Sequence, residues 1–267
     1  MLRLSVLAVS LVIIVGCSSG RRIPSPDAVR LATLHIDHAT GIDGRVDIAR
    51  IARFLKTIDA DIVALQGIDR WSDRSEKIDQ IVSLADALDR TYAYGRVRLL
   101  QTGETGNALL TRYPIIEERH VDADVGAGTA GFMLAVLERR GQAIVIVNTD
   151  LGGGENSFRL DATLEQIHQR IESFSALPLI VCGSAPEFTQ ADLSRFGHAS
   201  FGPPWRKIMA TDTLTPVADS HDHNRGFVLI YRQTLASENI TVSSAERVAT
   251  DASQYQPLIV ELRIKTD

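Results

Sequence analysis

Histidine and carboxylate side chains follow two apolar runs of the sequence, and these residue types could bind a metal ion. His35 and Asp37 stand two residues apart at the end of the run Val29–Ile36, so on a strand their side chains would share one face. Asp150 closes a second apolar run, Ala143–Leu151. Imidazole and carboxylate ligands together suit Zn²⁺ or Mn²⁺. The plainer alternative is a polar cluster whose members satisfy one another.

Two other groups of residues carry weaker signals of chemistry. His221 and His223 lie in a polar stretch without a third ligand, which is typical of solvated surface. Ser184, in Gly183-Ser184-Ala185, could act as a nucleophile only if Asp150 and His35 were arranged around it. The alternative for Ser184 is a small residue that replaces a larger one.

The elements that must position these side chains show clear apolar patterns. Ala143–Leu151 and Leu179–Cys182 are short unbroken apolar runs that end in polar residues, as strands buried on both faces do. In α/β proteins a site usually lies at the carboxyl end of such strands. Apolar residues at helical spacing predict helices over Asp47–Ile58, Glu76–Arg90 and Phe158–Phe174.

More strands are predicted than helices. Phe132–Arg139 and Gln142–Val147 form a hairpin joined at Arg140-Gly141. The other predicted strands are Val29–Ile36, a buried strand entered through the turn in Asp59–Gln66, Tyr92–Arg98, Asn107–Arg112, Phe227–Tyr231 and Pro257–Ile264. The buried runs need cover on both faces. Two packed sheets with helices outside therefore fit the pattern better than a single doubly wound sheet.

The composition is that of an ordinary globular protein. Apolar residues make up 45% and charged residues 23% of 267 residues, which argues against disorder. The formal net charge is −5 and no basic run occurs, so nothing indicates a strong electrostatic footprint for nucleic acid. Nucleic acid is therefore not expected as a partner.

The N-terminus predicts an address in the cell envelope. Arg3 precedes the apolar run Leu4–Val15, and Cys17 follows, a pattern typical of a secretory signal. Its end resembles the lipobox of bacterial lipoproteins, which implies a lipid on Cys17 and attachment to a membrane. In a Gram-negative cell this would be the periplasmic face of the outer membrane. We expect a signal peptide at 1–16, a lipidated tether at 17–27 and one domain at 28–267.

The order of several segments resembles the endonuclease/exonuclease/phosphatase superfamily, whose fold is DNase I-like. The matching segments, read along the chain, are Gly41–Arg53 (GIDGRVDIARIAR), Asp61–Gln66 (DIVALQ), Gly106–Ile115 (GNALLTRYPI), Val147–Leu151 (VNTDL) and Pro257–Leu262 (PLIVEL). This resemblance implies an α/β fold, a four-layer α/β/β/α sandwich of two mixed β-sheets packed face to face with helices outside. It also implies Mg²⁺-dependent hydrolysis of a phosphodiester or phosphomonoester.

The sequence departs from the family where the metal is bound. The first strand of the family normally ends in an asparagine near the metal, and His35 stands there. The family's metal-binding glutamate is replaced by Gly67, directly after Gln66. Asp150 takes the place of the histidine that contacts phosphate. A glycine offers no ligand atom, so Mg²⁺ would lack its carboxylate anchor.

The groups that activate water are replaced as well. The family's Gly-Asp-Phe-Asn becomes Gly183-Ser184-Ala185-Pro186, and Phe227 stands where a late aspartate is expected. The aspartate and histidine of the general base become Gln254 and Tyr255. Among the positions close to the site, only Asn107 keeps the family's residue.

These departures predict a pseudoenzyme that binds or scaffolds through the vestigial pocket and uses no cofactor. Its partner would be an envelope protein or ligand of unknown identity. The leading alternative is a metal-dependent phosphoesterase, a phosphodiesterase or phosphatase, with Mg²⁺, Mn²⁺ or Zn²⁺ held by His35, Asp37 and Asp150. Family geometry would place Asp150 beside the other two. A third alternative is a copy of the family drifting without a retained role.

Overall fold

The structure is a computed structural model that describes residues 27–124, 130–151, 160–174, 176–185, 205–208, 225–231 and 240–265. Within these residues the strands form two six-stranded sheets. The first has the order β11 (Ile240–Arg247), β12 (Leu258–Ile264), β1 (Ala28–His35), β2 (Ile62–Arg70), β4 (Glu104–Thr111), β3 (Thr91–Leu99). The second has the order β5 (Ile115–Val121), β6 (Phe132–Arg139), β7 (Gln142–Asp150), β8 (Leu179–Ala185), β10 (Arg225–Tyr231), β9 (Trp205–Ile208).

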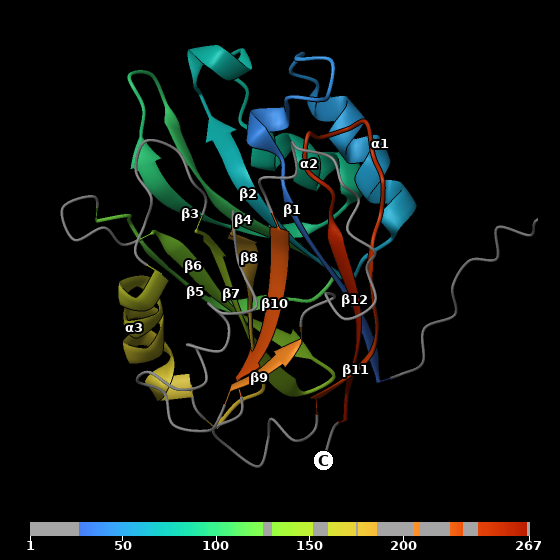
Figure 1. The fold of residues 1–267 in the computed structure, drawn as a ribbon, viewed down its shortest axis with the longest axis vertical. Helices are drawn as coiled ribbons and strands as arrows, with labels where there is room; N and C mark the ends of the chain where they lie inside the picture. Colours follow the sequence, from blue (N-terminus) through green and yellow to red (C-terminus); the bar gives the residue numbers. More distant parts are fainter. Residues whose placement is uncertain are drawn as a thin grey trace, which may run out of the picture.

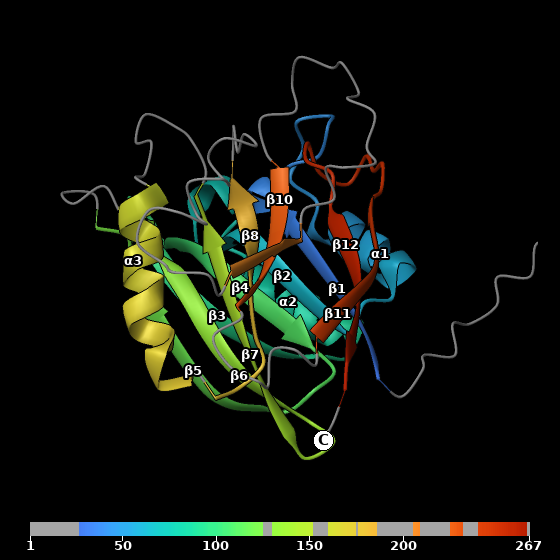
Figure 2. The ribbon, with the colours of Figure 1, turned by 60° about the horizontal axis from the view of Figure 1, so that its bottom comes forward.

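Each sheet contains one parallel pair among antiparallel neighbours. β1 runs parallel to β2 in the first sheet, and β7 runs parallel to β8 in the second. The two sheets pack face to face over a shared core that includes Leu31, Ile62, Leu109, Met133, Ile146 and Ile180. Figure 1 and Figure 2 show the sheets stacked, with the helices on the two outer faces.

The helices complete four layers. α1 (Ile48–Ile58) and α2 (Gln80–Leu88) cover the first sheet, while α3 (Leu160–Ile171) covers the second (Figure 1). The backbone N–H of Arg50 donates to the side chain of Asp47 at 2.9 Å, so Asp47 caps the start of α1. Asp59 ends that helix in a left-handed conformation. The four-layer α/β/β/α sandwich predicted from the sequence is confirmed.

The predicted start of the second helix at Glu76 is wrong. Asp73–Ser75 forms a short 3₁₀ turn, and Glu76 and Lys77 then adopt φ values of 59° and 57°, which no helix accommodates. Asp79 caps the true start, four residues after Ser75, and α2 begins at Gln80. The hairpin predicted at Arg140-Gly141 is confirmed, with both turn residues at positive φ.

Three strands are absent from the sequence-based prediction. β5 and β11 lie at sheet edges and alternate half-buried with exposed residues, so their apolar signal is weak. β9, the third, is a four-residue strand at the edge of the second sheet. No helix within the described residues is long and apolar enough to span a membrane.

Candidate functional site

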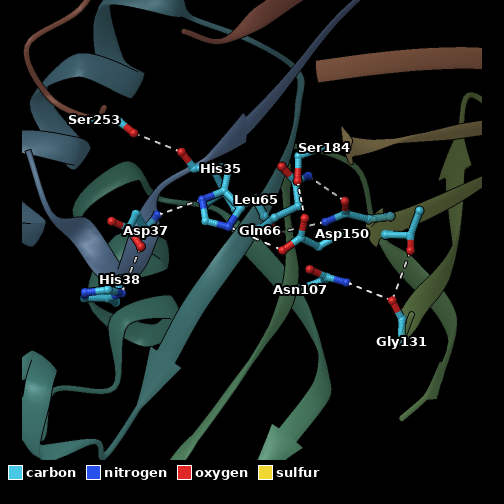
Figure 3. A network of polar contacts seen from close by, with 12 residues as sticks. His35, Asp37, His38, Leu65, Gln66, Asn107, Gly131, Asp150, Ser184 and Ser253 are labelled. Atoms are coloured by element: carbon cyan, nitrogen blue, oxygen red, sulfur yellow. Dashed lines mark hydrogen bonds and ion pairs between the residues drawn. The ribbon is translucent and has the colours of Figure 1, made fainter. Parts of the chain in front are cut away.

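His35 is the last residue of β1 and lies at the centre of a polar cluster (Figure 3). Its Nε2 is 3.3 Å from Oδ2 of Asp150. Its Nδ1 accepts a hydrogen bond of 3.1 Å from the backbone N–H of Asp37, so the neutral imidazole carries its hydrogen on Nε2. The Tyr255 ring packs edge-on against the imidazole with centroids 4.9 Å apart. The ring of His35 is therefore fixed on three sides.

Asp150 is the last residue of β7 and is held from two sides. The Ser184 hydroxyl donates to Oδ1 at 2.5 Å, while His35 reaches Oδ2. The parallel register of β7 and β8 pairs Asp150 with Ser184, and this pairing explains why their side chains meet. The imidazole and the hydroxyl thus contact different oxygens of one carboxylate. Ser184 is 1% exposed and donates to the carboxylate, so the structure does not place it as a nucleophile activated by His35.

Opposing effects act on the protonation of His35. Burial alone would lower its pKa, but the charge of Asp150, the hydrogen bond to Asp150 and the charge of Asp37 outweigh burial and raise the pKa above 6.5. The Arg74 guanidinium acts in the lowering direction. Since Nδ1 accepts from a backbone N–H, full protonation would also disrupt that hydrogen bond. The raised pKa therefore depends on the Asp150 carboxylate.

Gly67 lies at an irregularity of β2, where the pairing with β4 shifts between Leu65 and Ile68. Its φ of +68° is unfavourable for any residue with a side chain. A Cβ added there would lie 2.8 Å from Cε1 and 3.0 Å from Nε2 of His35. The imidazole of His35 thus occupies the space into which a side chain at position 67 would extend.

A buried layer of amides connects the two sheets behind the cluster. Gln66 Nε2 donates to Asn148 Oδ1 at 2.7 Å and to Thr33 Oγ1 at 3.0 Å. Asn148 Nδ2 donates to the carbonyl oxygens of Leu65 and Ala108, both at 2.9 Å. Neither Gln66 nor Asn148 is among the site residues predicted from the sequence. Their signal was present, because each is a lone amide at the end of an apolar strand.

Asn107, the remaining family residue, is 1% exposed in the same layer. Its Nδ2 donates to the carbonyl oxygen of Gly131 at 3.3 Å, and the Thr149 hydroxyl donates to the same oxygen at 3.0 Å. Its Oδ1 has no hydrogen-bond partner. In Figure 3 this oxygen faces the side of Asp150.

The placement of Asp37 on a strand with His35 is wrong, because β1 ends at His35. Asp37, His38 and Ala39 form a short turn with φ values of 47°, 46° and 68°, which is a left-handed conformation. The Asp37 carboxylate lies 3.2 Å from Nδ1 of His38. The structure therefore brings His35 and Asp150 together, and turns the carboxylate of Asp37 toward His38 instead.

The fit of these residues to the family's metal is poor. No group of three histidine, cysteine, aspartate or glutamate side chains that could hold a metal ion occurs in the part of the chain that the structure describes. Gly67 offers no ligand, and the carboxylate of Asp150 already accepts from Ser184 and contacts His35. A divalent ion such as Mg²⁺ needs several oxygen ligands in near-ideal geometry. The described side chains do not supply them.

The remaining predicted residues are placed as follows. Gln254 is exposed, next to the Tyr255 that packs on His35. The backbone of Phe227 pairs with Gly183 across β10 and β8. Pro186, His221, His223 and Cys17 lie outside the described residues.

Comparisons with known proteins agree with the fold. The sequence model of the Endonuclease/Exonuclease/phosphatase family matches residues 36–185, and the chain belongs to this family. An uncharacterized Escherichia coli K12 protein, YbhP, is 32% identical over 128 residues, which cover 42% of this chain and 49% of that one. The chain thus spans about half the length of the curated relatives it matches.

Solved structures of the family share the whole architecture at low identity. The human Nocturnin catalytic domain with bound sulfate anion aligns with a TM-score of 0.64 and 17% identity, covering 90% of this chain and 94% of that chain. The endonuclease/exonuclease/phosphatase from Bacteroides vulgatus aligns with a TM-score of 0.64 and 17% identity, covering 89% of this chain and 99% of that chain. At such identities these structures establish the fold and not the activity.

Proposed function

We propose that this chain is a catalytically degenerate member of the family, a pseudoenzyme, that binds a ligand or an envelope protein at the end of the sandwich where His35 and Asp150 lie. We further propose that a lipid on Cys17 anchors it in the cell envelope. The second proposal rests on the sequence pattern of residues 1–17 alone.

One observation carries the loss of catalysis. The His35 imidazole fills the space beside Gly67, where a Cβ would meet Cε1 at 2.8 Å. The family's metal-binding glutamate is expected at position 67. Two observations therefore agree: position 67 has no side chain to bind a metal, and the His35 imidazole occupies the space of that side chain. A metal could not be regained there by a single substitution.

The state of Asp150 supports the same conclusion. Its carboxylate accepts from Ser184 and contacts the imidazole of His35, both within the described cluster. Part of the charge and hydrogen-bonding capacity that could hold a metal ion is thus used inside the protein. The side chains of the cluster are held in fixed positions, and such preorganisation lowers the cost of binding a ligand.

The second candidate is a phosphoesterase with a rebuilt metal site at His35, Asp37 and Asp150. The 3.3 Å approach of His35 to Asp150 favours it, because two of the three ligands already meet. The pairing of Asp37 with His38 opposes it. This candidate requires Asp37 to rotate away from His38 when the metal binds.

Metal titration separates the two functions. The full chain, purified in detergent, is titrated calorimetrically with Mg²⁺, Mn²⁺ and Zn²⁺, and then assayed with bis-p-nitrophenyl phosphate and p-nitrophenyl phosphate. We expect no saturable binding and no turnover, while a family member with an intact metal-binding glutamate serves as the positive control. Metal binding that disappears in His35→Ala, together with turnover, would establish the phosphoesterase and overturn the proposal.

A further inference from the structure

A cavity of about 80 Å³ lies on the helix-covered face of the first sheet, apart from the His35 cluster. It is formed where α1 and α2, which pack against each other (Figure 1), reach their C-terminal ends. Val63, the second residue of β2, is part of its lining, whereas His35 pairs with Gln66 further along that strand. None of the described residues that line the cavity belongs to the His35 cluster.

The lining of this cavity is apolar at its floor and charged at its mouth. Leu55, Ala60 and Val63 are 3%, 3% and 4% exposed and form the floor. Lys56 and Arg90 also line the cavity, and Lys56 is exposed while Arg90 is half-buried. Since both cations are in contact with solvent, a ligand can reach the apolar floor past them.

Neither cation at the mouth takes part in an ion pair. In the part of the chain that the structure describes, no carboxylate pairs with Lys56 or with Arg90. The Arg90 guanidinium donates to the backbone carbonyl oxygen of Asp89 at 3.2 Å. Two positive groups without a carboxylate partner therefore flank an open apolar cavity.

The carboxylate that lines the cavity, Asp59, is bound by a third cation. Arg112 donates to Asp59 and, at 2.8 Å, to Asp61, so its guanidinium offsets the charge of both. Burial lowers the pKa of Arg90, and the charge of Arg112 lowers it further, while Asp59, Asp61 and Asp89 act in the raising direction. A bound anion would counter both lowering effects.

The ends of the two helices leave few free acceptors beside the cavity. Asp59 ends α1 and Asp89 ends α2, both in a left-handed conformation. The backbone N–H of Asp59 donates to the carbonyl oxygen of Leu55, and that of Asp89 donates to Ala85. Such caps satisfy carbonyl groups that would otherwise repel an anion.

We propose that this cavity binds a short aliphatic acid, with its carboxylate between Lys56 and Arg90 and its chain on the apolar floor. Ammonium and guanidinium groups form charge-assisted hydrogen bonds with a carboxylate. Because a water molecule takes about 30 Å³ of liquid volume, the cavity has room for a chain of about three carbon atoms. The site is separate from the surface at His35 and does not depend on the pseudoenzyme proposal.

A short alkyl phosphate has the same chemistry, an anionic group on a small apolar chain. It differs from a carboxylate in its greater negative charge and its larger head group. Competition between the two kinds of anion therefore identifies which of them the cavity takes.

Binding of 4,4,4-trifluorobutyrate to the full chain in detergent, followed by ¹⁹F NMR, tests this inference, with detergent alone as the reference. Lys56→Gln and Arg90→Gln should each weaken binding by about threefold or more, and the double variant by about tenfold or more, because each removes a charge-assisted hydrogen bond. Displacement of the probe at lower concentrations of butyrate than of n-butyl phosphate assigns the site to a carboxylate, and the reverse order assigns it to a phosphate ester.

Two further variants control for folding. Arg53→Gln removes a cation from α1 outside the cavity, where Arg53 is 68% exposed and pairs with Asp47, so its affinity should equal that of the unchanged chain. Asp59→Asn removes the negative charge at the mouth, and asparagine tolerates the φ of 50° at this position. This variant should bind the probe more tightly, which misfolding cannot imitate.

Absence of saturable binding, or equal affinity in the double variant and the unchanged chain, would overturn the anion site. Displacement by n-butylamine at the same concentrations as butyrate would also overturn it, because the cations at the mouth would then not select the charge. These results would leave the pseudoenzyme proposal standing, since metal titration and turnover test that proposal separately.

Discussion

The imidazole of His35 lies against Gly67, in the space where a side chain at position 67 would begin. A Cβ there would lie 2.8 Å from Cε1 of His35, and the residue has a φ of +68°. A glutamate at position 67 would therefore require the imidazole of His35 to move. We expect that reversion of position 67 alone does not create a metal site.

Gly67→Glu should lower the free energy of unfolding by more than backbone strain explains. The left-handed conformation alone costs on the order of 1–2 kcal/mol for a residue with a side chain, and the contact with His35 adds to it. No metal binding should appear. Chemical denaturation of Gly67→Ala and Gly67→Glu, followed by metal titration, measures both effects.

Gly44 supplies the control for this prediction. Its φ is +72°, and a Cβ there would meet nothing within 4 Å, so Gly44→Ala reports strain without a clash. The double variant His35→Asn/Gly67→Glu should recover part of the loss, because the clash disappears and the strain stays. Equal losses in Gly44→Ala and Gly67→Ala would show that the His35 contact is unimportant.

Asn148→Leu should destabilise the fold by about 2–6 kcal/mol, since it removes the hydrogen bonds that Asn148 donates to two buried carbonyl oxygens, at roughly 1–3 kcal/mol each. Those oxygens belong to Leu65 and Ala108. Urea denaturation measures the loss. Thr149→Val is the control and should cost about 1 kcal/mol, because the Gly131 carbonyl keeps its bond from Asn107. Similar losses in the two variants would contradict the amide layer as a link between the sheets.

The stability contributed by His35 should decrease as pH rises. The pKa of His35 is raised in the folded protein, so the protonated form is favoured by folding. The resulting stabilisation is fully present below the unfolded pKa, near 6.5, and is lost as pH rises through the higher folded value. The difference in unfolding free energy between the unchanged chain and His35→Asn should therefore shrink between pH 6 and pH 8.5, in urea titrations at each pH.

Replacement of Asp150 tests whether its carboxylate causes the pH dependence of the stability contributed by His35. Asp150 raises the pKa of His35 both by charge and by hydrogen bond, Asp37 adds to the effect, and Arg74 opposes it. Asp150→Asn should remove most of the pH dependence. If the difference in unfolding free energy between the unchanged chain and His35→Asn stays constant or grows with pH, the pKa of His35 is not raised by folding.

Cys17→Ala should release the protein from the membrane fraction, because acylation needs the thiol. Fractionation of cells followed by immunoblotting measures the distribution. Cys182→Ala is the matched control: Cys182 is fully buried in β8, so its replacement should leave membrane retention unchanged. Retention of Cys17→Ala in the membrane would refute the lipid anchor.

Much of the arrangement could be predicted from the sequence, since it depends on patterns that burial imposes. Apolar runs located β7 and β8, and the family resemblance placed His35 beside Asp150, which are 3.3 Å apart. β1 and β7 belong to different sheets, so this contact is made across the face-to-face packing of the two sheets. Edge strands such as β5 bury too few residues to show a pattern.

The conformation of single residues was beyond the sequence. The residue types of Asp37 and Glu76 do not by themselves predict a positive φ. These angles end β1 at His35, before Asp37, and place the start of α2 at Gln80, after Glu76. The direction of the His35 ring depends on a backbone N–H, a carboxylate and a tyrosine from three different segments. Such features arise only from tertiary packing.

The left-handed turn at Asp37, His38 and Ala39 sets the orientation of the His35 ring at some cost in backbone strain. Aspartate and histidine tolerate this conformation better than most residues, but alanine does not, and Ala39 holds φ at 68°. A single replacement by glycine would relieve that strain. The strained turn carries the amide that donates to Nδ1 of His35, so the orientation of the imidazole depends on a backbone conformation that residues with side chains rarely adopt.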